Sequence, residues 1–200
     1  YGPEHPALWK PHRNLGSALL LAGDLPAARR HLERAIELVG ASLGPSHAAT
    51  GPLQYALAAS YADSDSDSES DRKKDLDHAF KLATIALQTH IREVPDNNPR
   101  RVQPVILMGL LHTDRDEPAE ALPYREEVLR RLRHAGPEDR ADAHYNIAVT
   151  LHELHRSEEA LDHIRLASAL VSEFSTPSAE LVEDIEAYKA EILRSLGRTQ

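Results

Sequence analysis

An alternating run of acidic residues and serines is the first segment of this chain that could do chemistry. It runs from Asp63 to Asp71 and places carboxylate oxygens at every second position. A calcium-binding EF-hand loop starting at Asp63 would need glycine in place of Ser68 and glutamate in place of Lys74. The run therefore predicts a solvated acidic Ser/Asp loop over residues 63–75, and phosphorylation of its serines is the next interpretation.

Histidine is the second residue type with a potential role in chemistry, because the chain has 12 of them. His152 and His155 have the spacing of neighbours on one helix face, and His144 precedes them on the same predicted helix. Two such imidazoles could share a zinc ion, but no His-Glu-x-x-His arrangement accompanies them. We therefore expect surface or groove histidines here, and no metal site.

The sequence motifs of common enzymes are missing. There is no glycine-rich phosphate loop, no Gly-x-Ser-x-Gly turn and no carboxylate pair in a convincing setting. Aromatic residues make up 4% of the chain and are not interleaved with basic clusters, which argues against a platform for single-stranded nucleic acid. We therefore expect a protein that is not an enzyme and needs no cofactor.

Charge and composition narrow the class of protein further. Lys and Arg number 23 against 32 Asp and Glu, and a net charge of -9 argues against an extensive nucleic-acid or anionic membrane surface. No apolar run approaches the roughly 18 residues of a membrane span. Cysteine is absent, which excludes disulfides and thiolate zinc sites and is compatible with the cytoplasmic location that we expect.

Small residues that recur at regular spacing predict pairs of helices. The first set lies in the middle of four successive apolar helices, at Gly16, Ala58, Gly109 and Ala148. The second and third sets follow downstream, at Ala28, Ala79, Ala121 and Ala160 and then at Ala35, Ala86, Val128 and Ala167. Two helices can approach closely where both carry a small residue, so each copy predicts a helical hairpin.

A repeated linker supports the same division of the chain. Gly2-Pro3-Glu4-His5 recurs 42 residues later as Gly44-Pro45-Ser46-His47, where the histidines are expected to cap or pack between pairs. The predicted repeats cover residues 6–43, 47–95, 98–135 and 138–173, followed by a capping helix over about 178–197. The start at Tyr1, inside a linker, predicts a fragment of a longer protein.

This spacing resembles the tetratricopeptide repeat, with its Leu-Gly pair, its alanine followed four residues later by an apolar residue, and its later alanine. The Gly-Pro-x-His linker and the 42-residue period resemble the kinesin-light-chain variety of the repeat. The resemblance implies an all-α fold, a right-handed α-solenoid of about four helix hairpins plus a C-terminal capping helix. Arg125 departs from the pattern, because an apolar residue is expected at its position.

The resemblance also implies where a ligand would lie, because the first helix of each pair lines the concave side of such a stack. The peptide-binding residues expected there are Lys10, Arg13, Asn14, Ser17, Tyr55, Gln103, Ile106, Tyr145, Asn146, Val149 and His152. Asn14 and Asn146 match an asparagine of kinesin-light-chain-like repeats, whose amide suits an extended main chain. This surface, basic at its start and apolar-aromatic further on, would suit an acidic and hydrophobic segment. For each residue, packing between neighbouring hairpins is the alternative.

The favoured hypothesis is a protein–protein interaction scaffold that binds a peptide segment or partner protein on its concave surface. The alternative is a regulatory or sensor arm of a larger multidomain enzyme or signalling switch, such as an NTPase or kinase. In that case the partners would include other domains of the parent protein. Neither hypothesis involves nucleic acid or a membrane. A metal protein or enzyme that uses His144, His152 and His155 is the least favoured.

Overall fold

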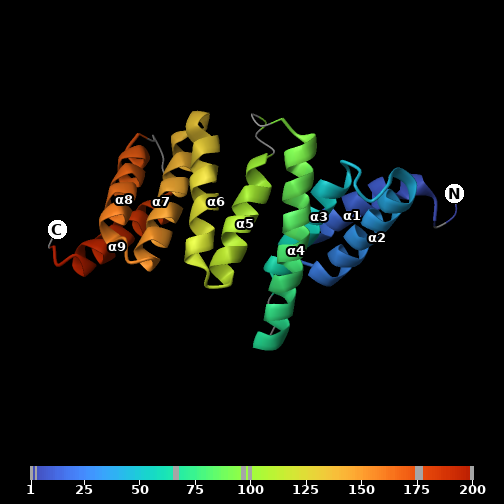
Figure 1. Cartoon of the computed structure of the whole chain (residues 1–200), viewed down its shortest axis with the longest axis horizontal. Helices are drawn as coiled ribbons and strands as arrows, with labels where there is room; N and C mark the ends of the chain where they lie inside the picture. Colours follow the sequence, from blue (N-terminus) through green and yellow to red (C-terminus); the bar gives the residue numbers. More distant parts are fainter. Residues whose placement is uncertain are drawn as a thin grey trace. The chain divides into compact units, whose positions relative to one another are not determined.

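The computed structural model of this chain describes residues 2, 4–64, 68–95, 98, 101–173 and 178–198. Nine α-helices make up most of this part, which contains no strand. They are α1 (Trp9–Leu21), α2 (Leu25–Leu43), α3 (Thr50–Ala62), α4 (Glu69–Glu93), α5 (Val102–Asp114), α6 (Pro118–Arg131), α7 (Pro137–Glu153), α8 (Ser157–Val171) and α9 (Ala179–Ser195), with short 3-10 helices at Pro6–Leu8 and Leu132–His134. None of these helices is long and apolar enough to cross a membrane. The chain divides into two compact units, residues 1–111 and 112–200 (Figure 1).

Two helical hairpins build the first unit. α1 packs on α2, α3 packs on α4, and α2 joins the two hairpins through its contact with α3 (Figure 1). Gly16 lies against α2 so closely that a Cβ atom built on it would be 2.8 Å from Cγ of Leu32 and 3.4 Å from the carbonyl oxygen of Ala28. A Cβ atom on Gly51 would likewise lie 2.9 Å from Cγ2 of Thr89. α1 and α2 are therefore in contact at the predicted position Gly16, and α3 and α4 are in contact at Gly51, which is not one of the predicted positions.

The second unit follows the same principle. α7 packs on α8, and α6 and α9 pack against this pair. The small residues of the hairpin, Ala148 and Ala160, have no exposed surface, and neither does Ile164 of the surrounding core. α9 adds Ile185 and Ile192 to that core and so covers an apolar surface of α7 and α8. The prediction of an all-α fold of packed helical hairpins is confirmed.

Local contacts of the linkers also match the sequence pattern. The amide of His5 donates to the carbonyl of Gly2 (3.0 Å), and the amide of His47 donates to the carbonyl of Gly44 (3.2 Å), so the repeated linker forms the same turn twice. Each imidazole then accepts a bond from the amide two residues on, at 3.2 Å and 3.1 Å. The capping role expected for these histidines is thus confirmed for His5, which caps the 3-10 helix, whereas α3, with Ala49 at its N-cap, has no side-chain cap.

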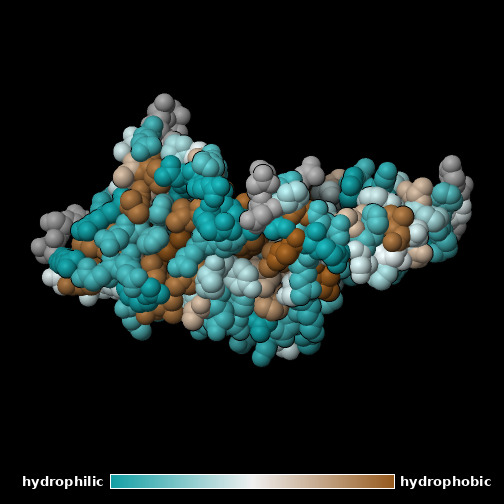
Figure 2. Space-filling model, turned by 45° about the horizontal axis from the view of Figure 1, so that its top comes forward, coloured by the Kyte–Doolittle hydropathy of each residue, from teal (hydrophilic) through white to brown (hydrophobic). Residues whose placement is uncertain are grey.

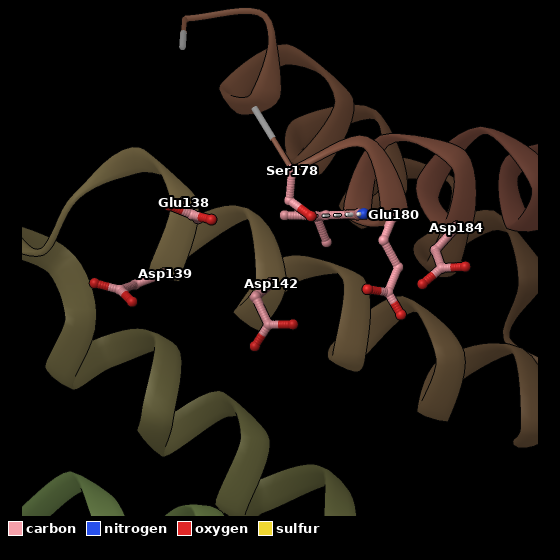
Figure 3. A pocket seen from close by; sticks show the side chains of 7 residues that line it. Glu138, Asp139, Asp142, Ser178, Glu180 and Asp184 are labelled. Atoms are coloured by element: carbon pink, nitrogen blue, oxygen red, sulfur yellow. Dashed lines mark hydrogen bonds between the residues drawn. The ribbon is translucent and has the colours of Figure 1, made fainter. Parts of the chain in front are cut away.

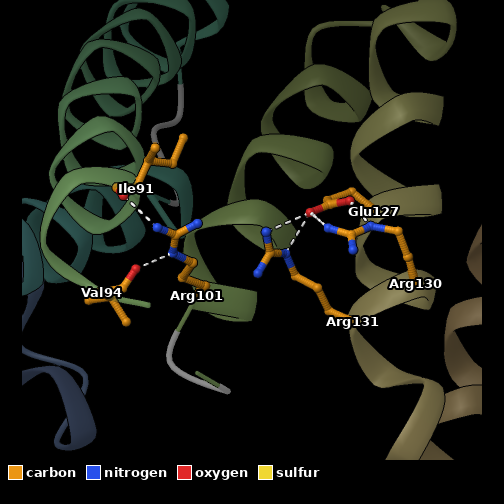
Figure 4. A network of polar contacts seen from close by, with 6 residues as sticks. All are labelled: Ile91, Val94, Arg101, Glu127, Arg130 and Arg131. Carbon is orange, nitrogen blue, oxygen red and sulfur yellow. Dashed lines mark hydrogen bonds and ion pairs between the residues drawn. The ribbon is translucent and has the colours of Figure 1, made fainter. Parts of the chain in front are cut away.

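Arginines bind the carbonyl groups and carboxylates near several helix ends (Figure 4). In the first unit Arg101 donates to the carbonyl oxygens of Val94 (2.6 Å) and Ile91, which the end of α4 leaves without helical partners. In the second unit Glu127 accepts bonds of 2.6 Å from Arg130 and Arg131, within the last turns of α6. These contacts hold the helix ends in the positions from which the next segments start.

The acidic run differs from the expected loop in its second half. Residues 65–67 lie outside the described part, but residues 69–75 form the first turns of α4 and not a loop. Ser68 caps this helix by accepting a bond from the amide of Asp71 (3.4 Å), and Lys74 pairs with the Asp71 carboxylate at 2.8 Å. Glu69 and Asp71 lie in the first turn, where their negative charge interacts favourably with the helix dipole. The extra residues of the second repeat therefore lengthen a helix that Ser68 caps.

Two pairs of histidines join the helices of the first and last hairpins. Nδ1 of His12 lies 2.9 Å from Nδ1 of His31, and Nδ1 of His144 lies 3.0 Å from Nδ1 of His163. Both pairs have ring centroids 5.1 Å apart, the separation expected when the two nitrogens point at each other. Such a pair holds a single proton between its rings, because one nitrogen must donate and the other accept.

The charge states of these rings follow from their surroundings. Burial, helped by the neighbouring His163 and Arg140, lowers the pKa of His144 to about 4. Burial also lowers the pKa of His163, although Glu126 and the carboxylates of its own helix act in the opposite direction. Burial, with smaller contributions from His31 and Arg34, lowers the pKa of His12 as well. These lowered pKa values favour the neutral forms of His12, His144 and His163.

A substitution at Gly16 should test the close approach of α1 and α2. Gly16→Val should lower the free energy of unfolding of the first hairpin by about 2 kcal/mol, because the added atoms would overlap Leu32. The matched control is Gly40→Ala in α2, where an added Cβ atom meets nothing within 4 Å. That change should raise stability by about 0.5–1 kcal/mol. Native-state hydrogen exchange of the α1 and α2 amides measures both, and equal effects would contradict the packing.

Acid should destabilise the second unit through its histidine pair. The unfolded chain takes up a proton on His144 near its ordinary pKa of 6.5, whereas the folded chain does so only near 4. The contribution of His144 to the free energy of unfolding is therefore complete above pH 6.5 and is lost as the pH falls from there toward 4. Urea unfolding of the unit at several pH values measures this loss.

A control variant follows from the chain itself. In the second repeat, Gln54 and Leu82 occupy the positions equivalent to His144 and His163. The double variant His144→Gln with His163→Leu therefore removes both ionisable rings and replaces them with residues that another repeat of this chain carries at the same positions. The variant should lose most of the pH dependence between about 6.5 and about 4. If the free energy of unfolding of this variant depended on pH as strongly as before, groups other than the histidine pair would cause the pH dependence.

Candidate functional site

An aromatic cluster connects α7 with α9 in the second unit. The rings of Tyr145 and Tyr188 meet edge to face with centroids 5.9 Å apart, and His152 meets Tyr188 in the same way at 5.7 Å. The hydroxyl of Tyr188 donates to the carbonyl oxygen of Val149 at 3.4 Å. Three expected site residues of α7 are thus brought together, and all four side chains remain partly exposed.

Arg125, the departure from the repeat pattern, supports this cluster from α6. Its guanidinium donates to the carbonyl oxygen of Asn146 (2.5 Å), to Oγ1 of Thr113 (2.8 Å) and to Oγ1 of Thr150. Burial lowers the pKa of the guanidinium, and the three oxygens accept bonds from three of its five N–H donors. An arginine therefore replaces the expected apolar residue by making hydrogen bonds that lock α6 onto α7.

A pocket of about 390 Å³ opens beside the aromatic cluster. Figure 3 shows the carboxylates that α7 and α9 contribute to this pocket. The lining residues are Glu138, Asp139, Asp142, Ser178, Glu180, Leu181 and Asp184. Ser178 caps α9 by accepting a bond from the amide of Leu181 at 3.5 Å (Figure 3). The pocket is therefore strongly acidic on both of its walls.

Burial, together with nearby acidic groups, raises the pKa values of three residues on α7 and α9. Burial raises the pKa of Asp142, and the nearby Asp139 raises it further. Burial likewise raises the pKa of Tyr145, with Asp184 and Asp142 adding to the effect. Burial and neighbouring acidic groups together raise the pKa of Tyr188 to about 12. Negative charge thus surrounds two neutral phenol rings.

In the first unit, two expected site residues bind each other. The hydroxyl of Tyr55 on α3 donates to Oε1 of Gln103 on α5 at 3.1 Å, and Ile106 is partly buried on α5. Burial raises the pKa of Tyr55. These side chains therefore take part in packing between neighbouring first helices, which was the alternative considered for each of them.

The expected basic residues gather at the start of α1. Lys10 and Arg13 lie over the ring of Trp9, at 5.7 Å and 5.5 Å from its centroid. Arg13 also donates to Oδ1 of Asn14 at 3.0 Å, which occupies the acceptor of that amide. Ser17 lies one turn further on and is exposed. α1 thus presents a cationic and aromatic surface.

Comparison with known proteins identifies the arrangement of the hairpins. Residues 1–70 match a family model described as tetratricopeptide repeat. The TPR-like repeats of a protein from Podosopora anserina, described as a kinesin light chain, superpose with a TM-score of 0.76 at 15% sequence identity. That alignment covers 96% of this chain and 89% of the other. The fold is that of tetratricopeptide repeats.

Other tetratricopeptide-type structures superpose less closely. MamA from Desulfovibrio magneticus RS-1 has a TM-score of 0.68 at 15% identity, over 98% of this chain and 87% of that one. The Rap protein, in a complex with Competence and Sporulation Factor, has a TM-score of 0.62 at 18% identity, over 93% of this chain and 48% of that one. No curated protein matches the chain by sequence. The predicted resemblance to kinesin-light-chain-like repeats is thus confirmed at the level of fold.

Tyr188 and the acidic residues are the part of this tetratricopeptide face that sequence reasoning missed. Two signals for them were present in the sequence. Tyr188 stands two residues before Ala190, as Asn146 stands two residues before Ala148. Glu138 and Glu180 are 42 residues apart, and so are Asp142 and Asp184. The last repeat and the capping helix therefore carry acidic residues in matching places.

The grouping of histidines considered from the sequence is wrong. His155 lies in the turn after α7 with a φ of 59°, and not on the helix face of His152. His152 instead lies 3.0 Å from the hydroxyl of Ser157, and His144 is paired with His163. In the described ranges, no three histidine, cysteine or acidic side chains are close enough together to hold a metal ion.

Some apolar side chains are exposed elsewhere in the part of the chain that the structure describes. Figure 2 shows a largely hydrophilic face on which hydrophobic side chains form separate patches. Among the described side chains, Leu21 is the most exposed large apolar residue at 92%, and it stands at the end of α1. The aromatic cluster and its acidic pocket therefore remain the best candidate for a binding face.

Proposed function

We propose that the protein is a non-catalytic scaffold that binds an extended segment of a partner protein on the face formed by α7 and α9. This binding face consists of Tyr145, Asn146, Val149 and Tyr188 together with the pocket beside them. The observation that carries the proposal is the partly exposed Tyr145–Tyr188 pair, which joins the same two helices that enclose a pocket of about 390 Å³. Tyrosine is a frequent anchor of protein interfaces, because its ring buries apolar area while its hydroxyl stays wet.

Asn146 supplies the polar contact that an extended backbone needs. Its side-chain amide donates to the carbonyl oxygen of Asp142 at 2.9 Å, which fixes the orientation of the group. The amide oxygen has no partner among the described residues and can accept a bond from the main chain of a ligand. A fixed amide next to two aromatic rings favours a bound peptide over a small molecule.

The rigid support beneath this face favours binding without large rearrangement. Arg125 ties the backbone at Asn146 to α6, and Tyr188 ties α9 to the carbonyl of Val149. A face that is already ordered loses little conformational entropy when a ligand binds. The Rap protein, whose fold is similar, holds Competence and Sporulation Factor in a complex.

Photo-crosslinking in cells that make the intact protein should test the proposed face. A crosslinking phenylalanine analogue at Tyr145 should capture a partner, whereas the same group at Leu166, an exposed residue of α8, should not. Tyr145→Ala with Asn146→Ala should then weaken binding of the captured partner about tenfold, because an interface anchor is lost. Calorimetry of the purified pair measures the affinity.

The control for this loss is Leu166→Ala, which removes exposed apolar area from another helix. Circular dichroism of all variants should show unchanged helicity. Equal capture at Leu166 and Tyr145, or unchanged affinity in the double variant, would place the binding surface elsewhere.

A further inference from the structure

The charges of the binding face are strongly unbalanced. Five carboxylates line the pocket between α7 and α9, and no cationic side chain lines it. No ion pair within 4.0 Å joins any of the five to a cationic side chain in the part of the chain that the structure describes. Arg125, the cation that supports the face, is directed instead at the oxygens of Thr113, Asn146 and Thr150. The five carboxylates are therefore available to form ion pairs with a bound partner.

Helix stability accounts for only part of this charge. Glu138 and Asp139 lie in the first turn of α7, and Glu180 lies in the first turn of α9, where acidic residues favour the helix dipole. Asp142 and Asp184 lie one turn further on, beyond the reach of that effect. Burial and the nearby Asp139 also raise the pKa of Asp142, against the opposing effects of Asn146 and Arg125.

The aromatic rings beside these two carboxylates define the kind of cation that fits. Tyr145 and Tyr188 belong to the same two helices as the acidic walls, and both Asp184 and Asp142 act on the Tyr145 hydroxyl. An ammonium or guanidinium group can contact a ring face and a carboxylate at once. No three metal-ligating side chains come together in the described ranges, which disfavours a divalent ion.

We infer that the α7–α9 face selects a segment rich in lysine and arginine, whose side chains enter the pocket lined by Asp142 and Asp184 and contact Tyr145. This inference rests on the function proposed above and adds the chemistry of the partner. It also differs from the acidic segment favoured by the sequence alone, because such a segment would meet like charges on this face. Electrostatic complementarity of this kind sets specificity more than total affinity.

A library of random peptides displayed on phage, selected on the intact protein, should test the inference. The enriched peptides should carry an excess of lysine and arginine. A synthetic copy of an enriched peptide should bind Asp142→Asn with Asp184→Asn roughly tenfold more weakly, since each partly exposed charge pair contributes a small amount. Fluorescence anisotropy measures this change, which should shrink as salt is added.

The matched control removes the same charge from elsewhere in the unit. Asp162→Asn with Glu183→Gln changes two exposed carboxylates of α8 and α9 that do not line the pocket. This variant should bind the peptide as the unchanged protein does. An equal loss in both variants would mean that only net charge attracts the peptide, and would overturn the inference.

The outcomes also separate the inference from the proposed function. Peptides that need Tyr145 for binding but carry no excess of basic residues would overturn the inference and leave the proposed function standing. Enrichment of no peptide that depends on Tyr145 would overturn both. Basic peptides that bind the Asp142/Asp184 variant unchanged would overturn the inference alone.

Discussion

The close approach of paired helices at small residues is the constraint on which the structure depends. At Gly16 the neighbouring helix comes so near that even one added carbon would overlap Leu32. In the second unit Ala148 and Ala160 have no exposed surface. Because these contacts fix how each hairpin packs, they also decide which side chains of the first helices are left to face solvent.

The hairpins could be predicted because close packing tolerates few residue sizes, so small residues recur in the same order in each repeat. The start of α4 could not be predicted from the same signal. Ser68 caps a helix within a run whose composition alone indicates a loop. The histidine pairs were missed for another reason, since His144 and His163 stand 19 residues apart and meet only once the hairpin has formed.

The binding face, too, could be predicted from the sequence only in part. The sequence placed Tyr145, Val149 and His152 on one helix face, and the structure brings them together around Tyr188. The chemistry of the face, however, depends on what α9 places opposite α7. Acidic residues on two helices form one pocket only if the helices lie side by side, and composition alone does not contain that information.

A double-mutant cycle between Gly16 and Leu32 tests the packing most directly. Gly16→Ala should destabilise the α1–α2 hairpin of the unchanged protein, because the new Cβ atom would lie 2.8 Å from Cγ of Leu32. In a Leu32→Ala background the same change should be neutral or stabilising, because the overlapping atoms are gone and alanine favours helix. Hydrogen exchange of the α1 and α2 amides gives the four free energies. An equal effect of Gly16→Ala in both backgrounds would contradict the packing of small residues on which the account is built.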